Sequence, residues 1–205
     1  MDRVIAEVDR AVYHIFCPQP SSRPYPAEGV AEAELSPREK RLSAALMRVN
    51  HAGEICAQAL YQGQSIIARD PRIAERLQKA SIEEADHLNW CLRRIEELGG
   101  RRSLLDPLWY LGSLAIGIAA GIPGDRWNLA FLAETERQVA EHLDGHLRRL
   151  PPSDARTRAI VEQMKEDELK HKSTAEQLGA AEMPGFVRKL MRLAAKVMTT
   201  TAERI

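Results

Sequence analysis

One spacing, present twice, constrains this chain more than any other feature: a glutamate, about thirty residues, and then Glu-x-x-His. The first copy consists of Glu54, Glu84 and His87, and the second of Glu136, Glu168 and His171. Each Glu-x-x-His places a carboxylate and an imidazole one turn apart on the same side of a helix. Four helices that direct these six side chains inward can form a complete ligand set for two metal ions. The spacing therefore predicts an all-α protein whose four-helix bundle surrounds a pair of metal ions.

Prolines, glycines and capping residues divide the chain into helices. Ser36-Pro37-Arg38-Glu39 is typical of a capping box with proline in the first helical turn. We expect helices at about 37–69, 71–98, 106–121, 123–150, 153–179 and 184–205, the fifth capped by Ser153. A short helix at about 2–16 and a Pro-rich linker precede them, so we divide the chain into residues 1–36 and a helical domain at 37–205.

The acids of the repeated spacing lie on apolar helix faces. Residues 4, 7 or 11 positions apart lie within about 40° of each other on a helix. By this rule Glu84 shares its face with Leu77 and Leu88, and Glu136 shares its face with Leu129. Glu168 also falls within an apolar stripe, whereas Glu54 lies toward the edge of one. Four carboxylates buried in one core need compensating charge, which two divalent cations would supply.

Two alternatives stay open at this point. The four acids could lie on solvated helix edges, or they could form core ion pairs with Arg48 or Lys165. We expect the neighbouring acids to face solvent: Glu83, Glu134, Glu166 and Asp167. His142 and His146 could orient a ligand carboxylate, or they could be ordinary half-buried helix histidines.

The ligand set itself indicates the metal. Four carboxylates with two imidazoles form a hard oxygen and nitrogen set, which suits iron or manganese and argues against a zinc–cysteine site. We expect Glu84 and Glu168 to bridge both ions, with Glu54 and His87 completing one and Glu136 and His171 the other. Six ligands leave positions open for O2, and no catalytic side chain is expected beyond the ligands.

Residues 107–124, PLWYLGSLAIGIAAGIPG, contain no charged side chain. The stretch could be a buried core helix, a membrane span, or a helix lying in the plane of a bilayer; a span needs about 20 apolar residues. Aromatic residues at its ends and a basic amphipathic last helix, with Phe186 and Leu190 on the apolar side, favour the in-plane alternative.

Composition excludes some classes of protein. The formal net charge is 0, which argues against a broad nucleic-acid interface. The 3 cysteines include no C-x-x-C pair, so we expect a reducing compartment and no disulfide framework. The first sixteen residues are charged throughout, so no secretory signal peptide is expected there.

Five segments resemble the demethoxyubiquinone hydroxylase family, a branch of the ferritin-like di-iron carboxylate superfamily. They are RVNHAGE (48–54), YQGQ (61–64), EEADHL (83–88), ETERQVAEHL (134–143) and EDELKH (166–171), and the resemblance covers about residues 37–205. Matched motif by motif, the family's iron ligands fall on the same six residues that helix geometry selects. The resemblance implies a ferritin-like four-helix bundle with additional membrane-associated helices.

The resemblance also implies an activity. It predicts an O2-dependent di-iron monooxygenase of ubiquinone biosynthesis that hydroxylates the ring of a polyprenylated methoxy-methyl-benzoquinol. Two iron ions and an external reductant, for which NADH is a candidate, are the implied cofactors. The implied location is the surface of a membrane: the cytoplasmic face of the bacterial inner membrane or the matrix face of the mitochondrial one. The quinol, O2, the lipid surface and other ubiquinone-biosynthesis proteins are the implied partners.

Rival hypotheses come from two classes. One is another ferritin-like di-metal oxidase, such as a ferroxidase, a lipid hydroxylase or a tRNA-modifying hydroxylase. A soluble ferroxidase needs no uncharged 18-residue segment, and a tRNA enzyme should carry a basic excess. The other is a membrane-associated helical scaffold without catalysis, which would hold no stoichiometric iron.

Overall fold

The computed structural model describes residues 21–205, and within this range it contains helices and no strands. The helices are α2 (Pro37–Ile67), α3 (Pro71–Glu97), α4 (Asp106–Gly121), α5 (Asp125–Arg149), α6 (Ala155–Gln177) and α7 (Gly185–Ala202). The predicted all-α fold is confirmed. The helix expected at 2–16 lies outside the described residues.

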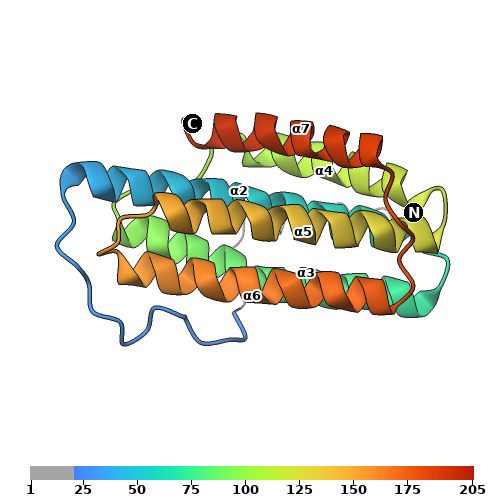
Figure 1. The fold of residues 1–205 in the computed structure, drawn as a ribbon, viewed down its shortest axis with the longest axis horizontal. Helices are drawn as coiled ribbons and strands as arrows, with labels where there is room; N and C mark the ends of the chain where they lie inside the picture. The colour runs from blue at the N-terminus through green and yellow to red at the C-terminus, as the bar shows by residue number, and fades with distance from the viewer. Residues whose placement is uncertain (1–20) are drawn as a thin grey trace.

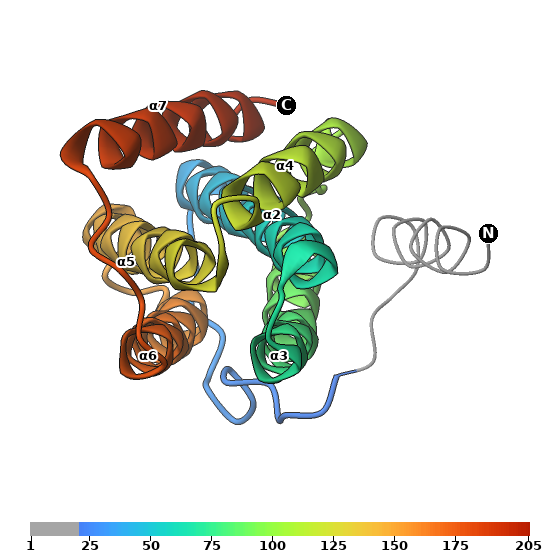
Figure 2. The same ribbon diagram turned by 90° about the vertical axis from the view of Figure 1, so that its right-hand side faces the viewer.

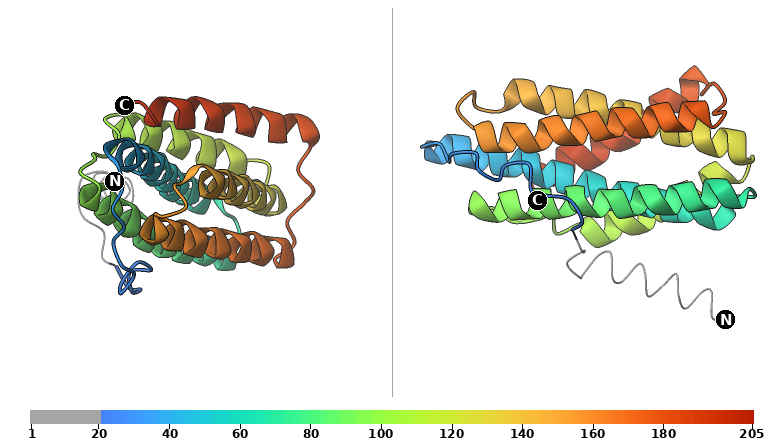
Figure 3. Two further views of the ribbon diagram at one scale, coloured as in Figure 1. Left: turned by 60° about the vertical axis from the view of Figure 1, so that its left-hand side comes forward. Right: turned by 90° about the horizontal axis from the view of Figure 1, so that it is seen from below.

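Two helical hairpins form the bundle (Figure 1). Helices α2 and α3 make the first hairpin, and α5 and α6 make the second. Viewed along the bundle, the four helices occupy the corners of a square (Figure 2), and α4 and α7 both lie on the side formed by α2 and α5. The remaining views show the same layering, with α3 and α6 on the side opposite α4 and α7 (Figure 3). Every helix of the square can thus direct one face into a shared interior.

Side chains cap the starts of α2, α3 and α6, whereas α4, α5 and α7 begin without a side-chain cap. The Ser36 hydroxyl accepts from the Glu39 backbone N–H and the Glu39 carboxylate accepts from the Ser36 N–H, which completes the capping box of α2. Asp70 caps α3 by accepting from the Arg72 N–H. The predicted Ser153 cap of α6 is wrong. Asp154 takes that place, because its carboxylate reaches the Thr157 N–H and hydroxyl.

Helix α4 packs against α2 with almost no space between the two backbones. A Cβ atom on Gly63 of α2 would lie 2.5 Å from the Leu114 carbonyl oxygen and 2.7 Å from the Ile118 nitrogen of α4. Gly117 of α4 faces the Leu60 backbone of α2 in the same way. Gly63 of α2 and Gly117 of α4 therefore allow α4 to pack closely on the bundle along one face, while its other face lies outward.

Residues 21–35, which we call the N-terminal strap, cross the groove between α3 and α6. Tyr25 and Ala27 are buried in the core cluster that includes Trp90 of α3 and Met164 of α6. The buried guanidinium of Arg94, on α3, pairs with Glu32 of the strap and with Asp154 at the start of α6. The strap is thus tied to both hairpins.

Among residues 21–205, no helix combines the length with the apolar character needed to cross a membrane.

The close packing of α4 on α2 predicts a position-specific effect of a single methyl group. We expect Gly63→Ala to lower the free energy of unfolding by about 1–3 kcal/mol, because the added Cβ meets backbone atoms that cannot move aside cheaply. Urea unfolding followed by circular dichroism measures this change.

Gly112→Ala on α4 is the matched control. No atom lies within 4 Å of the position its Cβ would take, so the substitution should raise stability by about 0.5–1 kcal/mol through helix propensity. Equal stability of the two variants would contradict the packing described here.

Candidate metal centre

The six residues of the repeated spacing converge between the two hairpins. Their side chains are all buried, at most 6% exposed, and come from all four helices of the square. They form two overlapping groups, within each of which one ligand atom per residue lies within 4.8 Å of all the others: Glu54, Glu84, His87 and Glu168, and Glu84, Glu136, Glu168 and His171. Because Glu84 and Glu168 belong to both groups, the arrangement has the form of two adjacent cation sites.

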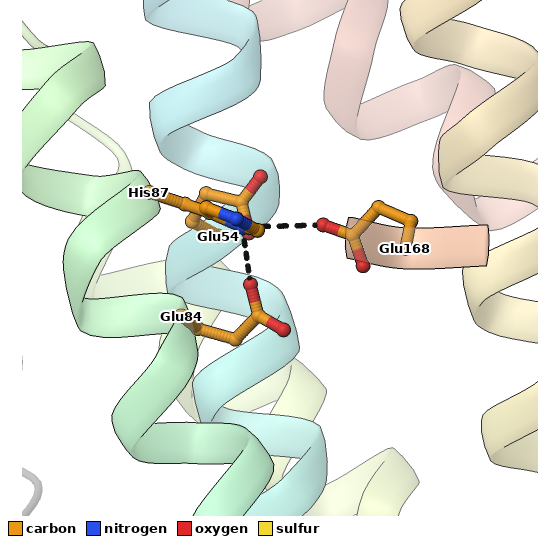
Figure 4. A group of neighbouring side chains, drawn as sticks. All are labelled: Glu54, Glu84, His87 and Glu168. Carbon is orange, nitrogen blue, oxygen red and sulfur yellow. Dashed lines mark ion pairs between the residues drawn. The ribbon is translucent and has the colours of Figure 1, made fainter. Parts of the chain in front are cut away.

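The shared position of Glu84 and Glu168 is visible in the distances. His87 Nδ1 lies 2.7 Å from Glu84 Oε2 and 3.3 Å from Glu168 Oε1, with Glu54 Oε2 at 3.8 Å (Figure 4). On the other side, His171 Nδ1 lies 3.2 Å from Glu84 Oε1 and 3.5 Å from Glu168 Oε2. Each central carboxylate therefore directs one oxygen toward each histidine, as a ligand that bridges two ions does.

The inward atoms of this cluster have contacts but no hydrogen bonds. Among residues 21–205, both carboxylate oxygens of Glu84 and of Glu168 are buried without a hydrogen-bond partner, and so is Nδ1 of His87 and of His171. Unpaired polar atoms at this depth cost several kcal/mol each. Divalent cations of intermediate hardness bind carboxylate oxygens and imidazole nitrogens together, so a pair of such ions fits both the charge and the donor set.

The electrostatics of the cluster also favour cations. Burial raises the pKa of the Glu54 and Glu136 carboxyls well above the usual range. Burial acts against protonation of His87 and His171, yet the surrounding carboxylates raise the pKa of both imidazoles. Without metal, the cluster thus retains protons to balance its negative charge. Metal ions would compete with those protons for the same atoms.

Two acids outside the six candidate ligands contact the Nε2 atoms of the histidines, one acid for each histidine. Asp167 Oδ2 lies 3.2 Å from His87 Nε2, and Glu83 Oε2 lies 2.7 Å from His171 Nε2. Each acid directly precedes the central glutamate of its own helix and reaches the histidine of the other helix. An acceptor at Nε2 places the proton there and leaves Nδ1 free to bind a metal.

The expectation that Glu83 and Asp167 face solvent was wrong. Their positions lie off the apolar stripe of their own helices, but the neighbouring helix covers them. The signal available in the sequence was the repetition itself, because both motifs carry an acid immediately before the central glutamate: Glu83-Glu84 and Asp167-Glu168. Glu166 is exposed, as expected. Glu134 is buried instead, and it pairs with Arg137.

Tyr61 is a further contact that helix phase did not single out. Its hydroxyl is buried and donates a hydrogen bond to Glu136 Oε1. Burial, followed by the charge of Glu136, raises the pKa of Tyr61 well above its usual value, so the phenol keeps its proton. Tyr61 therefore holds one oxygen of Glu136 in place.

The proposed role of His142 or His146 in orienting a ligand carboxylate was wrong. Their rings contact each other, with centroids 4.0 Å apart, and the nitrogens of His146 have no hydrogen-bond partner among residues 21–205. The ion-pair alternative for the buried acids is also excluded. Arg48 donates to the Ala202 and Glu203 carbonyl oxygens, and Lys165 pairs with Asp144.

The contacts at Nε2 predict that the outer acids tune metal affinity. We expect Asp167→Asn and Glu83→Gln each to weaken binding of Fe(II) or Mn(II) by about 10- to 100-fold, because each replaces the carboxylate that orients one histidine by a neutral amide, which is a weaker acceptor. Anaerobic calorimetric titration of the metal-free protein measures the change. Glu166→Gln is the control on the same stretch of α6; its side chain is exposed, so its affinity should match the wild type.

Comparison with solved structures supports the architecture. A dodecameric thioferritin, the bacterioferritin-related protein from Bacteroides fragilis, matches with a TM-score of 0.54 over 80% of this chain and 92% of that one. The two sequences are 16% identical, so the likeness concerns the fold alone. The predicted ferritin-like bundle is confirmed.

Comparison with known sequences gives the family. The model of the family "Ubiquinone biosynthesis protein COQ7" matches residues 41–202. Proteins named 3-demethoxyubiquinol 3-hydroxylase are 57% identical in Chromobacterium violaceum and 58% in Aromatoleum aromaticum, each over 100% of both chains. The Azoarcus sp. protein of that name is 59% identical over 100% of this chain and 99% of its own. The chain therefore belongs to the COQ7 family of ubiquinone biosynthesis proteins.

Proposed function

We propose that this protein is a 3-demethoxyubiquinol 3-hydroxylase that inserts one oxygen atom of O2 into the ring of a polyprenylated benzoquinol. Two electrons and two protons convert the second oxygen atom to water. The observation that carries the proposal is the pair of overlapping ligand groups in the core, combined with family membership over residues 41–202. Full-length relatives that carry this name and share more than half of their residues support the choice of substrate.

We further propose that the cofactor is a pair of iron ions. Glu84 and Glu168 would bridge the ions; Glu54 and His87 would complete one, and Glu136 and His171 the other. When bound, the pair supplies the electrons that activate O2. An external reductant, for which NADH is our candidate, would restore those electrons.

The protein's own part is to position the ligand side chains and to exclude water from the site. Asp167 and Glu83 keep the Nε2 protons of the two histidines, so that both Nδ1 atoms face the ions. Tyr61 holds one oxygen of Glu136 through its hydroxyl. Buried apolar side chains lie within two turns of the acids on α2, α3 and α5: Ala57, Leu77, Ala80, Leu129 and Leu132. This dry setting strengthens each charge interaction and limits the loss of activated oxygen to water.

A lipid-facing side fits a polyprenylated substrate. Both α4 and α7 lie on one side of the bundle (Figure 2). Both helices expose large apolar side chains. The exposed set on α4 and its flanks is Leu104, Leu108, Leu111, Ile116 and Ile122, and on α7 it is Phe186, Leu190, Leu193 and Val197. Basic residues of α7 lie between them: Arg188, Lys189, Arg192 and Lys196. In-plane helices that bind anionic lipid combine these features.

We therefore propose that the protein is peripheral to a membrane, on the cytoplasmic face of a bacterial inner membrane. Residues 37–205 would form the hydroxylase domain, and other ubiquinone-biosynthesis proteins would be its partners. Helix α4 is not a fully buried core helix, because only its glycine-lined face packs on α2. The exposed apolar side also argues against a soluble ferroxidase, because such an enzyme does not require a lipid-facing surface.

The proposed activity predicts the phenotype of one core substitution. Glu168→Ala should abolish hydroxylation and iron binding while helix content stays near that of the wild type, because the change removes one of four mutually repelling carboxylates. Quinone extracts from cells that lack the gene, complemented with each variant, measure the activity. The demethoxy quinone should accumulate with Glu168→Ala and disappear with the wild type or Glu166→Gln. Normal quinone with Glu168→Ala would remove that residue from the site.

The lipid-facing side predicts a loss of membrane affinity. Phe186 is 68% exposed and Leu190 60%, and each inserted side chain contributes about 1.5 kcal/mol. The double substitution Phe186→Ser and Leu190→Ser should therefore weaken partitioning onto anionic liposomes by about 100-fold in a sedimentation assay. Ile82→Ser on α3 is the control, with 67% exposure on a helix away from α4 and α7. Equal losses in both variants would contradict the assignment of this side to lipid.

A further inference from the structure

We propose that Arg23 of the N-terminal strap makes the two halves of the metal centre inequivalent, since it pairs with the carboxylate behind His87 and has no counterpart behind His171. The inference rests on the proposed metal centre. It makes Arg23 a positioning residue that acts through Asp167, although Arg23 precedes the segment that the family model matches.

The contacts of Arg23 lead directly to one histidine. Its Nη2 lies 2.5 Å from Asp167 Oδ2, the same oxygen that accepts from His87 Nε2 at 3.2 Å. The Arg23 guanidinium also lies 4.7 Å from the centre of the Trp90 ring, which in turn lies 5.3 Å from the His87 ring. Arg23 therefore reaches the outer side of His87 by two routes, one through the Asp167 carboxylate and one through the Trp90 indole.

The strap holds Arg23 in this position through a second acid of α3. Asp86 accepts from the Ser21 hydroxyl at 2.9 Å, the Ser22 N–H at 2.6 Å and the Ser22 hydroxyl at 3.0 Å. The Arg23 N–H also donates to it, at 3.3 Å. Two residues further on, Tyr25 is buried in the core. With its backbone fixed on both sides, Arg23 has little freedom to leave Asp167.

The other half of the centre lacks such an ion pair. Glu83 Oε2 accepts from His171 Nε2 at 2.7 Å, and no lysine or arginine among residues 21–205 lies within ion-pair distance of Glu83; Arg76 and Lys79 act on its charge only from farther away. The Glu83 side chain is 32% exposed, against 8% for Asp167. The Tyr61 hydroxyl bonded to Glu136 is a further difference between the two halves, and the ion pair of Arg23 with Asp167 is what distinguishes their outer acids.

The contacts of Arg23 determine which of the two iron ions is the easier to reduce. A carboxylate oxygen shared with an arginine is a weaker acceptor, so it draws the Nε2 proton of His87 less strongly and leaves less electron density at Nδ1. The positive charge of Arg23 acts in the same direction, because it disfavours the more highly charged state of a nearby ion. The iron held by His87 and Glu54 should therefore accept an electron before the iron held by His171 and Glu136.

Mössbauer spectroscopy of protein loaded with 57Fe tests the inference. We expect the wild type to show two quadrupole doublets, of which Arg23→Gln shifts one and Glu83→Gln shifts the other. In samples reduced by one electron per chain, ferrous iron should occupy the site whose doublet responds to Arg23→Gln. That preference should be lost in Arg23→Gln itself, because removal of the cation lowers the potential of that site.

A structural role alone would not produce this pattern. Arg93→Gln is the matched control: Arg93 also stacks on an aromatic ring of the strap, 4.0 Å from the Tyr25 centroid, and pairs with an acid, Glu97, but it does not contact Asp167. Both doublets should stay unchanged in Arg93→Gln. Arg23→Lys, which keeps the charge, serves as the second variant and should retain the wild-type order of reduction.

The outcomes separate this inference from the proposed function. Wild-type protein that binds no iron would overturn the metal centre itself. Protein that binds two iron ions per chain, but whose doublets are insensitive to Arg23→Gln or move together, would overturn the inference about Arg23 and leave the metal centre intact.

Discussion

The burial of four carboxylates between two helical hairpins is the constraint on which the rest of this structure depends. No lysine or arginine among residues 21–205 pairs with them, and within that range the inward oxygens of Glu84 and Glu168 have no hydrogen-bond partners. Such a core is stable only if cations, or protons in their absence, offset the negative charge. The raised pKa values of Glu54, Glu136 and both histidines mean that the metal-free cluster retains protons, which offset this charge. The same residues therefore cost stability in the empty cluster and provide the capacity to bind metal.

The surrounding structure supports the two halves of the cluster in a crossed manner. Each of α3 and α6 carries an acid, a central glutamate and a histidine, and the acid of one helix binds the histidine of the other. The hairpins thus position each other's ligands, which ties the site to the correct docking of α3 on α6. The N-terminal strap packs across these two helices, and its described residues pair with Asp167 but not with Glu83.

Helices α4 and α7 give the bundle two unlike sides. Gly117 of α4 and Gly63 of α2 let the two helices lie backbone to backbone, and α4 exposes Leu108, Leu111 and Ile116. Helix α7 buries little besides Ala202, and its apolar and basic residues are exposed. A bundle that carries a reactive centre inside and an apolar surface on one side is suited to a substrate dissolved in lipid.

Much of this protein can be read from its sequence, because helix periodicity and capping are local. The spacing of Glu54, Glu84 and Glu136 with the two Glu-x-x-His motifs predicted four helices and the six inward residues, and the capping box at Ser36 and Glu39 predicted where α2 begins. Asp154 replaced Ser153 as a cap because its carboxylate also meets Thr157 and Arg94.

Contacts between helices were decided only by the tertiary structure. Glu83 and Asp167 lie off the apolar stripe of their own helices, and only the docking of α3 beside α6 places each of them on a histidine of the other. The same holds for Arg23, which lies 144 positions from Asp167 along the chain. Periodicity states which side of a helix is apolar, but it does not state which polar side chain of another helix will meet it. The sequence by itself determined the six candidate ligands, and the fold decided what holds them in place.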